Sequence, residues 1–333
     1  MLHRKIGPNG PLVSALGIGA MSFSDFYGPT NQANSFAILD RARDVGVTHI
    51  DTANVYGMGV SEQVIGRYLQ GNPEARDGFH IATKAAIARD AQNGHSYFDN
   101  SAEHLERELD KSLSLLGTDH VDLFYVHRRD PDVPIEEVAG TLGALKAKGK
   151  TRGVGFSEIA PSSLRRAARE CPIDAAQSEY SLSTRSPELG LVQTCAALGT
   201  TLVAFSPVGR SLLTDAPMTP EHIKDSAFLS SNPRFIEPNY SANLRSIKPF
   251  QELAADMGLP AAGLAIAWVL AKGVHITAIP GTRSVAHFEE FVAGWQRQLS
   301  SDEVQAVEEV LPVGWAQGDR YNAAQWTGPE RYC

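Results

Sequence analysis

Short apolar runs alternate with longer amphipathic segments along nearly the whole chain. The short runs are rich in apolar and β-branched residues and end in a polar residue or a glycine, which is typical of buried strands. Eight of them predict strands, at 15–21, 47–51, 79–84, 121–127, 152–157, 175–179, 201–206 and 275–281. Helical periodicity predicts helices at 35–45, 61–69, 101–116, 135–148, 161–169, 187–198, 248–257, 261–271 and 285–298. The pattern is a strand followed by a helix, repeated eight times.

Polar residues at the strand ends decide between two arrangements of these units. Parallel strands joined by helices either close into a barrel or spread into a doubly wound sheet. In an open sheet only the strands at the switch point carry functional side chains, whereas a barrel collects them from many strands on one rim. Six predicted strands end in such a residue, namely Asp51, Lys84, His127, Ser157, Gln177 and Ser206. We therefore predict an α/β fold, a (β/α)₈ TIM barrel.

Two segments depart from the simple repeat. Residues 3–6 and 12–14 flank an Asn-Gly turn, which predicts an N-terminal β-hairpin that closes the floor of the barrel. Residues 210–247, after the seventh strand, are far longer than an ordinary connection, and long loops in compact domains are usually lids or binding loops. With no linker and no internal repeat, we predict one domain over residues 1–333, with 210–247 as a candidate lid.

Aromatic residues gather in two further places. Phe23, Phe26 and Tyr27 follow the first strand, and we interpret them as an aromatic wall of a substrate pocket rather than as core under a loop. The C-terminal tail, residues 312–333, contains Trp315, Tyr321 and Trp326. Two arrangements of the tail stay open, one folded over the active rim and one lying along the outside. Trp268, on a helix of small residues, is predicted to be core.

Composition and charge exclude several classes of function. The 333 residues are 43% hydrophobic and 20% charged, which is typical of a globular protein, and the net charge of −8 disfavours nucleic acid and membrane surfaces as partners. The longest apolar stretch, 259–271, is too short to span a bilayer, and no secretory signal is evident. Three cysteines without a CxxC motif argue against disulfides. We expect a cytoplasmic protein.

Four residues from three successive strand ends form a chemically coherent set. A nearby ammonium from Lys84 favours the phenolate of Tyr56 and is expected to lower its pKa. Asp51 is expected to keep the lysine charged, and His127 to hydrogen-bond a substrate oxygen. The set predicts a general acid beside a carbonyl group.

Each of these residues alone has an ordinary structural explanation. A strand-end Asp is usually a cap, a Lys a solvated rim residue and a His a satisfied hydrogen bonder, so only the joint arrangement carries the prediction. No His-x-His follows the first strand and the other histidines are scattered, so no metal site is predicted. The Gly-x-Gly pairs at Gly17 and Gly153 lack the third glycine of a dinucleotide-binding loop.

Several motifs together resemble the aldo-keto reductase superfamily over nearly the whole length. They are Leu16-Gly-Ile-Gly-Ala-Met, Asp51-Thr-Ala-Asn-Val-Tyr56-Gly, Thr83-Lys84, His127-Arg, Gly155-Phe-Ser157-Glu158, Gln177-Ser-Glu-Tyr180, Phe205-Ser-Pro-Val-Gly-Arg210 and Ile279-Pro-Gly-Thr-Arg283. The Ser-Glu pair and Gly-Asp319-Arg-Tyr321 resemble the bacterial and plant branch. The resemblance implies that Tyr56 is the proton donor, that Lys84 and Asp51 tune it, and that His127 orients the carbonyl.

The resemblance also implies a nicotinamide cofactor along the rim. Ser157 and Gln177 match positions that bind the carboxamide, and Phe205 one that stacks on the nicotinamide ring. The match to the pyrophosphate loop covers Ser206, Val208, Gly209 and Arg210, and the match to the 2′-phosphate segment covers Gly281, Thr282 and Arg283. His287 and Phe291, close to Glu290, differ from the residues that are usual at these positions in the family, which weakens the expectation that the cofactor carries a 2′-phosphate. We expect NADPH, with NADH possible.

The expected activity is the NADPH-dependent reduction of an aldehyde or ketone, or the reverse reaction, on a small-molecule substrate. A cofactor-binding redox sensor or regulatory subunit with little turnover is the alternative, because the same four residues fit both. A lyase or hydrolase barrel would need a metal or a nucleophile, for which the sequence offers no candidate. Substrate identity, physiological direction and oligomeric state cannot be read from these patterns.

Overall fold

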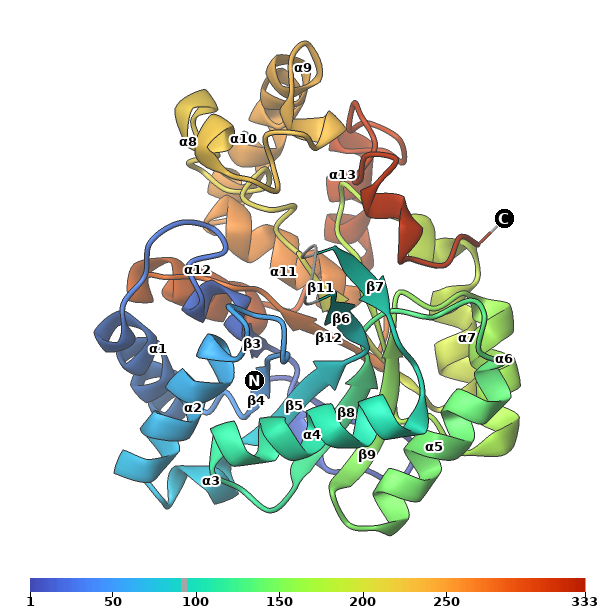
Figure 1. The fold of residues 1–333 in the computed structure, drawn as a ribbon. Helices are drawn as coiled ribbons and strands as arrows, with labels where there is room; N and C mark the ends of the chain where they lie inside the picture. The colour runs from blue at the N-terminus through green and yellow to red at the C-terminus, as the bar shows by residue number, and fades with distance from the viewer. Residues whose placement is uncertain (91–94, 333) are drawn as a thin grey trace.

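Eight parallel strands form the centre of the molecule, which we describe from a computed structural model covering residues 1–90 and 95–332 (Figure 1). Their order around the barrel follows the chain, and parallel bridging of Leu16 to Ala278 brings the last strand back to the first. The barrel strands are β3 (Gly17–Gly19), β4 (His49–Asp51), β5 (His80–Ala85), β8 (Val121–Val126), β9 (Thr151–Ser157), β10 (Ala175–Glu179), β11 (Thr201–Phe205) and β12 (Ile276–Ile279). The predicted TIM barrel is confirmed.

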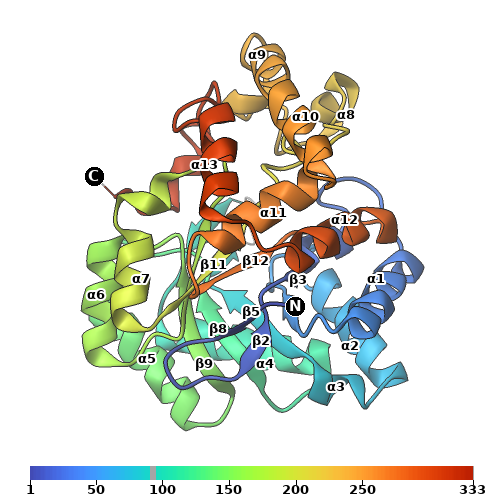
Figure 2. The same cartoon turned by 180° about the vertical axis from the view of Figure 1, so that it is seen from behind.

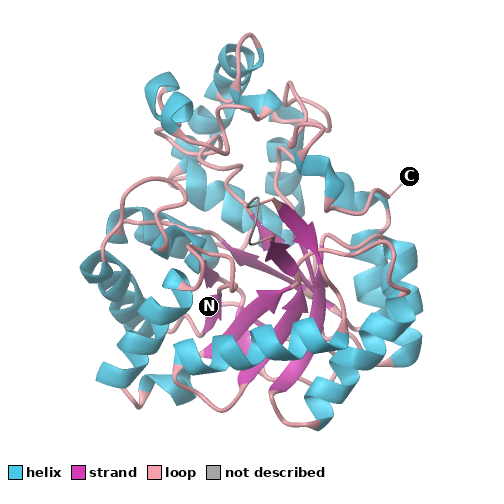
Figure 3. Cartoon of the chain, in the orientation of Figure 1, coloured by secondary structure: helices cyan, strands magenta, loops and turns pink. Residues whose placement is uncertain are grey.

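Helices surround the strands on the outside (Figure 3). They are α1 (Gln32–Val45), α2 (Val60–Gly71), α3 (Ala75–Gly78), α4 (Ala102–Leu116), α5 (Ile135–Ala147), α6 (Pro161–Glu170), α7 (Leu191–Leu198), α10 (Lys248–Asp256), α11 (Ala261–Ala271), α12 (Val285–Gln296) and α13 (Ser301–Val310). Apolar side chains of these helices and of the outer faces of the strands form the larger core. Trp268 is fully buried there, as predicted.

The N-terminal hairpin closes the floor of the barrel, as predicted (Figure 2). Strand β1 (His3–Lys5) pairs antiparallel with β2 (Leu12–Ser14). Ile6 and Val13 pack with the side chains that fill the barrel interior. The Oγ1 of Thr201, the first residue of β11, accepts from the Gly7 amide at 2.9 Å and donates to the Lys5 carbonyl at 2.7 Å. The hairpin therefore lies at the amino ends of the strands, opposite the polar rim.

Two local predictions need correction, and some elements were not predicted. The predicted helix 187–198 is divided, because Gly190 adopts φ 141° between a 3₁₀ turn (Ser186–Leu189) and α7. The predicted loop 210–247 contains α8 (Pro220–Asp225), a 3₁₀ turn (Pro233–Phe235) and α9 (Asn239–Ser246). Elements that were not predicted include α13, which begins at a Ser300–Glu303 capping box, and a hairpin of β6 (Ile87–Arg89) with β7 (Ser96–Phe98).

The C-terminal tail crosses the active rim, which settles the two arrangements left open by the sequence. Tyr321 and Gly328 line the cavity described below, and the Glu330 carboxylate accepts a hydrogen bond from the Ala160 amide at 2.7 Å. A last 3₁₀ turn covers Gln325–Thr327. In the described part of the chain no single helix has the length and apolar composition of a membrane span. The segment Asn239–Asp256, which contains α9 and α10, meets that criterion only together with α11, and the two are bent by 86° relative to each other.

Candidate active site

A cavity of about 730 Å³ opens at the carboxyl ends of the barrel strands. Its wall combines strand ends, the β6–β7 hairpin, the segment after β11 and the tail. Left-handed backbone is concentrated directly after three of these strands, where φ is 103° at Ala86, 56° at Glu158, and 49°, 56° and 78° at Ser206, Arg210 and Ser211. Side chains rarely adopt this conformation, and such strain is concentrated at functional sites. The polar rim predicted from the sequence therefore surrounds this cavity.

Three of the four predicted catalytic residues form a bonded chain beneath the cavity. The Lys84 ammonium is fully buried, forms an ion pair with Asp51, and donates to the Thr52 carbonyl at 2.8 Å and to the Tyr56 hydroxyl at 3.3 Å. Gln177 donates to the second carboxylate oxygen of Asp51 at 2.7 Å. Every hydrogen of the ammonium thus has an acceptor, and both oxygens of the carboxylate are satisfied. We call Asp51, Lys84 and Gln177 the inner cluster.

Burial and the charges of neighbouring groups together set the pKa values of Lys84 and Tyr56. Burial alone lowers the pKa of Lys84, but Asp51 and Tyr56 outweigh it, so the pKa is raised above 10.5 and the lysine stays charged. Burial raises the pKa of Tyr56, and the lysine offsets only part of that rise. The expectation that the pKa of Tyr56 falls was therefore wrong, because burial is the larger effect. Tyr56 holds its proton at neutral pH.

His127 faces the same space as Tyr56. Their ring centroids are 5.8 Å apart in an edge-on arrangement, and both side chains line the cavity. Burial, with smaller contributions from the cations Arg128 and Lys84, holds the pKa of His127 well below 6.5. Its Nδ1 is buried and has no partner among the described residues. The histidine is therefore neutral, and its side chain lines the cavity.

Most of the predicted cofactor residues lie on one continuous wall of the cavity. Phe291 also lines the cavity, as does Arg283, whose guanidinium donates to the Pro29 carbonyl at 3.2 Å. The lining includes Ser157, Gln177, Phe205, Ser206, Val208, Arg210, Gly281, Thr282, Arg283, His287 and Glu290. Gly209 is not part of the lining, and Lys84 lies beneath it, bonded to Tyr56. Their assignment to parts of a cofactor stays a prediction.

A second buried group of charges holds the tail against the strand ends. Arg320 forms an ion pair with Glu158 and lies 3.4 Å from Glu179, which in turn forms an ion pair with Arg210. We call Glu158, Glu179, Arg210 and Arg320 the outer cluster. Burial alone raises the pKa of Glu158, but the arginines outweigh it and lower the pKa below 4.5. The guanidinium of Arg210, predicted to cover a pyrophosphate, is thus used by a carboxylate of the protein.

The predicted aromatic wall is confirmed in part. Phe26 and Tyr27 line the cavity, whereas Phe23 is only 1% exposed in the core. Phe228, from the segment after β11, packs on Phe26 and on Tyr321 of the tail, with ring centroids 5.5 and 6.3 Å apart. Neither contact could be read from local sequence. The cavity therefore has an aromatic side opposite its polar strand ends.

Arg128 is a cavity residue to which the sequence reasoning assigned no role. It belongs to the quoted His127-Arg motif, and its side chain lines the cavity beside Tyr56 and His127. The signal for it was its position two residues after the end of β8 and one residue beyond the predicted histidine.

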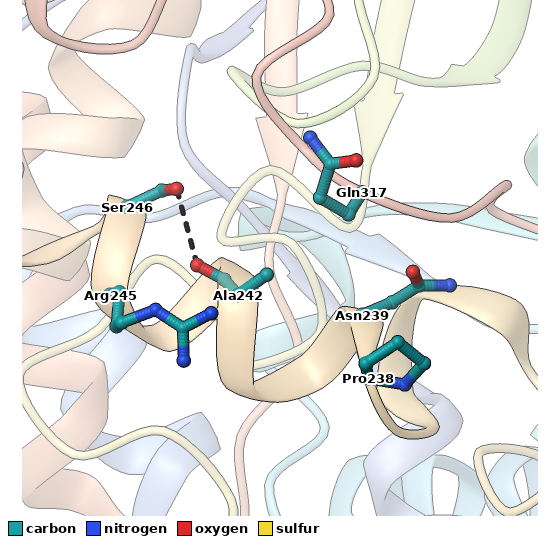
Figure 4. Close-up of a pocket in the computed structure, with 6 residues that line it drawn as sticks. All are labelled: Pro238, Asn239, Ala242, Arg245, Ser246 and Gln317. Atoms are coloured by element: carbon teal, nitrogen blue, oxygen red, sulfur yellow. Dashed lines mark hydrogen bonds between the residues drawn. The ribbon is translucent and has the colours of Figure 1, made fainter.

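A second hollow, of about 490 Å³, lies away from the strand ends (Figure 4). It is formed by one face of α9 and the tail, and it includes Arg245 and Gln317. The Ser246 hydroxyl in its wall donates to the Ala242 carbonyl at 3.2 Å, within the helix. No residue predicted to be functional lines it, and we place the candidate site in the larger cavity.

Comparison with known proteins gives one consistent result. Residues 15–312 match the family model described as "Aldo/keto reductase family". The chain is 34% identical over 321 residues to a protein of Schizosaccharomyces pombe named "Aldo-keto reductase yakc [NADP(+)]", covering 96% of this chain and 94% of that one. It is 33% identical over 318 residues to "Probable aldo-keto reductase 1" of Glycine max, covering 95% and 91%.

Solved structures agree with these relatives. The glycerol dehydrogenase of Gluconobacter oxydans superposes with a TM-score of 0.81 at 26% identity, covering 93% of this chain and 94% of that one. An aldo-keto reductase of Bacillus halodurans superposes with a TM-score of 0.76 at 24% identity, covering 98% and 99%, which supports the fold alone.

Proposed function

Since this chain belongs to the aldo/keto reductase family and is an oxidoreductase that acts on carbonyl groups, we propose that it reduces an aldehyde or ketone with NADPH and that Tyr56 supplies the proton. The observation that carries the proposal is the bonded chain from Asp51 through Lys84 to the Tyr56 hydroxyl, which opens into the cavity beside neutral His127. We treat residues 1–333 as one catalytic domain.

Each residue has a defined task in this reaction. A reduced nicotinamide, when bound, supplies the hydride that adds to the carbonyl carbon. Tyr56 and His127 donate hydrogen bonds to the carbonyl oxygen, and Tyr56 transfers its proton to that oxygen as the alcohol forms. The tyrosinate that remains is stabilised by Lys84, 3.3 Å away. Asp51 keeps Lys84 charged and fixed throughout.

The far wall of the cavity fits a phosphorylated dinucleotide. Arg283 and the amino end of α12 at Ser284 form a cationic corner with Thr282, suited to a 2′-phosphate. The half-buried ring of Phe205 offers a face for nicotinamide, and Ser157 lies nearby for its carboxamide. The NADP(+) in the name of the yeast relative supports the same preference.

Tyr56→Phe tests the proton donor. We expect kcat for aldehyde reduction, followed by NADPH absorbance, to fall by roughly 10²- to 10⁴-fold, the usual contribution of a general acid. NADPH affinity, measured by fluorescence, should be unchanged. Tyr97→Phe, which removes a hydroxyl from an exposed residue of β7, is the matched control. A kcat within about threefold of wild type in Tyr56→Phe would contradict the mechanism.

Arg283→Ala tests the cofactor wall. Loss of one charge-assisted contact to the 2′-phosphate should weaken NADPH binding by roughly 10- to 150-fold and leave NADH binding nearly unchanged. Titration of both cofactors into one protein sample makes NADH the internal control. Equal weakening of both would place the phosphate elsewhere. Tight NADPH binding by wild type with no turnover on aromatic and aliphatic aldehydes, sugars or cyclic ketones would favour the redox-sensor alternative.

A further inference from the structure

Arg128 differs from Arg210, which also lines the cavity, because no carboxylate of the described residues neutralises its charge. Arg210 and Arg320 form ion pairs with Glu179 and Glu158, and the neighbouring Arg129 lies 3.3 Å from the carboxylate of Glu330. Among the residues that the structure describes, no carboxylate lies within 4.0 Å of Arg128. Arg128 acts electrostatically on Glu158, but the carboxylate of Glu158 is already bonded to Arg320.

The Arg128 side chain is held in one position. Its Nη1 donates to the His127 carbonyl at 2.6 Å and to the Ser157 hydroxyl at 3.1 Å. Buried Asn100 donates to the Arg128 carbonyl at 3.0 Å. The tail packs on its methylene groups so closely that a Cβ on Gly328 would lie 2.9 Å from Cδ. The guanidinium is thus fixed without needing a counter-ion of its own.

Two nitrogens of this fixed guanidinium stay free. In the described part of the chain, Nε and Nη2 have no hydrogen-bond partner, while the residue lines the cavity beside Tyr56 and His127. A half-buried charge without a partner is costly, and a planar guanidinium matches a carboxylate through two parallel hydrogen bonds. The free groups therefore fit an anion that enters with the substrate.

We propose that Arg128 is a specificity-determining residue that binds a carboxylate carried by the substrate, so that the enzyme prefers oxo acids to neutral aldehydes and ketones. The proposal rests on the proposed function, because it names the substrate class of the same site. Tyr56 and His127 hold the reacting carbonyl oxygen, and Arg128 holds the carboxylate of the same molecule. The ion pair forms without a proton transfer, because arginine is charged at all working pH values.

The test compares each of 2-, 3- and 4-carboxybenzaldehyde with its methyl ester, since the three isomers scan the distance between the two groups. Wild type should reduce at least one acid with a kcat/KM about tenfold or more above its ester. Arg128→Met should lower kcat/KM for that acid by roughly 10- to 150-fold, mainly through KM, and leave the ester within about threefold. Arg128→Lys should retain part of the preference at pH 6 to 9.

Arg165→Met is the matched control, because it removes an exposed guanidinium from the outer helix α6. A wild-type preference for every ester, or an equal loss on acid and ester in Arg128→Met, would overturn the proposal; the second result would mean that Arg128 acts through Ser157 or the carbonyl oxygen.

Calorimetric titration with benzoate and with benzyl alcohol gives a readout that needs no turnover. Benzoate should bind wild type about tenfold or more tightly than it binds Arg128→Met, with benzyl alcohol unchanged. That difference in a protein that reduces neither acid nor ester would support Arg128 as a carboxylate site while the proposed reduction fails. Equal benzoate binding by the two proteins would overturn the carboxylate site.

Discussion

The inner and outer clusters are both buried groups of opposite charges, but they join different parts of the chain. In the inner cluster, Asp51 and Lys84 come from neighbouring strands and are 33 residues apart. In the outer cluster, Arg320 pairs with Glu158, which lies 162 residues earlier in the sequence. The first places an ammonium 3.3 Å from the hydroxyl of Tyr56, the proposed proton donor, and the second holds the tail across the rim. In the proposed mechanism, similar electrostatics therefore serves proton transfer in one place and assembly of the cavity wall in the other.

The largest expected effect comes from breaking the inner cluster with Lys84→Met. Turnover should fall by roughly 10²- to 10⁴-fold, because the tyrosinate loses its cation. The free energy of unfolding should fall by about 3–5 kcal/mol, since Asp51 is left buried without its ion-pair partner. Steady-state kinetics and urea unfolding measure the two effects.

The double variant Asp51→Asn with Lys84→Met separates these two effects. It removes the stranded charge and should recover much of the lost stability while kcat stays low. Recovery of kcat in the double variant would show that the ammonium is not needed for proton transfer.

Breaking the outer cluster with Arg320→Met should have a smaller effect of a different kind. The tail loses its ion pair to Glu158, so KM should rise roughly tenfold, equivalent to about 1.4 kcal/mol, with kcat within about threefold. Hydrogen exchange of residues 319–332 should become faster. Arg331→Met, which removes an exposed tail guanidinium outside the cluster, is the control. An unchanged exchange rate would show that other contacts fix the tail.

The smallest effect is a difference in pH response between the clusters. The pKa of Glu158 is lowered below 4.5, so its contribution to stability is present above pH 4.5 and is lost as pH falls through the lowered value. The pKa of Lys84 is raised above 10.5, so its contribution is present below pH 10.5 and is lost as pH rises through the raised value. Acid should therefore weaken the outer cluster through Glu158, and alkali should weaken the inner cluster through Lys84.

Glu158→Gln checks that assignment. Its difference from wild type in unfolding free energy should shrink as the pH falls from 4.5 through the lowered pKa of Glu158, where the folded wild-type carboxylate becomes protonated. A difference that stays constant from pH 7 to pH 3 would show that the charge of Glu158 does not contribute.

The contrast between the clusters also shows how far sequence reasoning reaches. The barrel strands and the Asp51–Lys84 pair of the inner cluster were predictable because strand ends of parallel units meet on one rim, which local patterns reveal. The hydrogen bond from Gln177 to Asp51 was not predicted. Nothing local pairs Arg320 with Glu158, so the outer cluster and the free charge of Arg128 needed the folded chain. The direction of the Tyr56 pKa was wrong because the depth of burial cannot be read from neighbours in the sequence.

The predictions missed some smaller elements for similar reasons. Strands β6 and β7 have three residues each, too few to show an alternating pattern, and their connection, residues 91–94, falls outside the described residues. The Ser300–Glu303 capping box was a readable signal for α13 that the periodicity search passed over.

The hairpin at the floor of the barrel has a practical consequence for anyone attaching this protein to a surface or to another protein. Met1 is 64% exposed at the amino ends of the strands, and the carbonyl of Leu2 is held by the indole of Trp295 at 2.7 Å. An affinity tag or a fusion partner joined there lies on the face opposite the cavity and should leave catalysis intact. The same attachment after Tyr332 would pull on the segment that closes the cavity, so immobilisation is better made through the amino end.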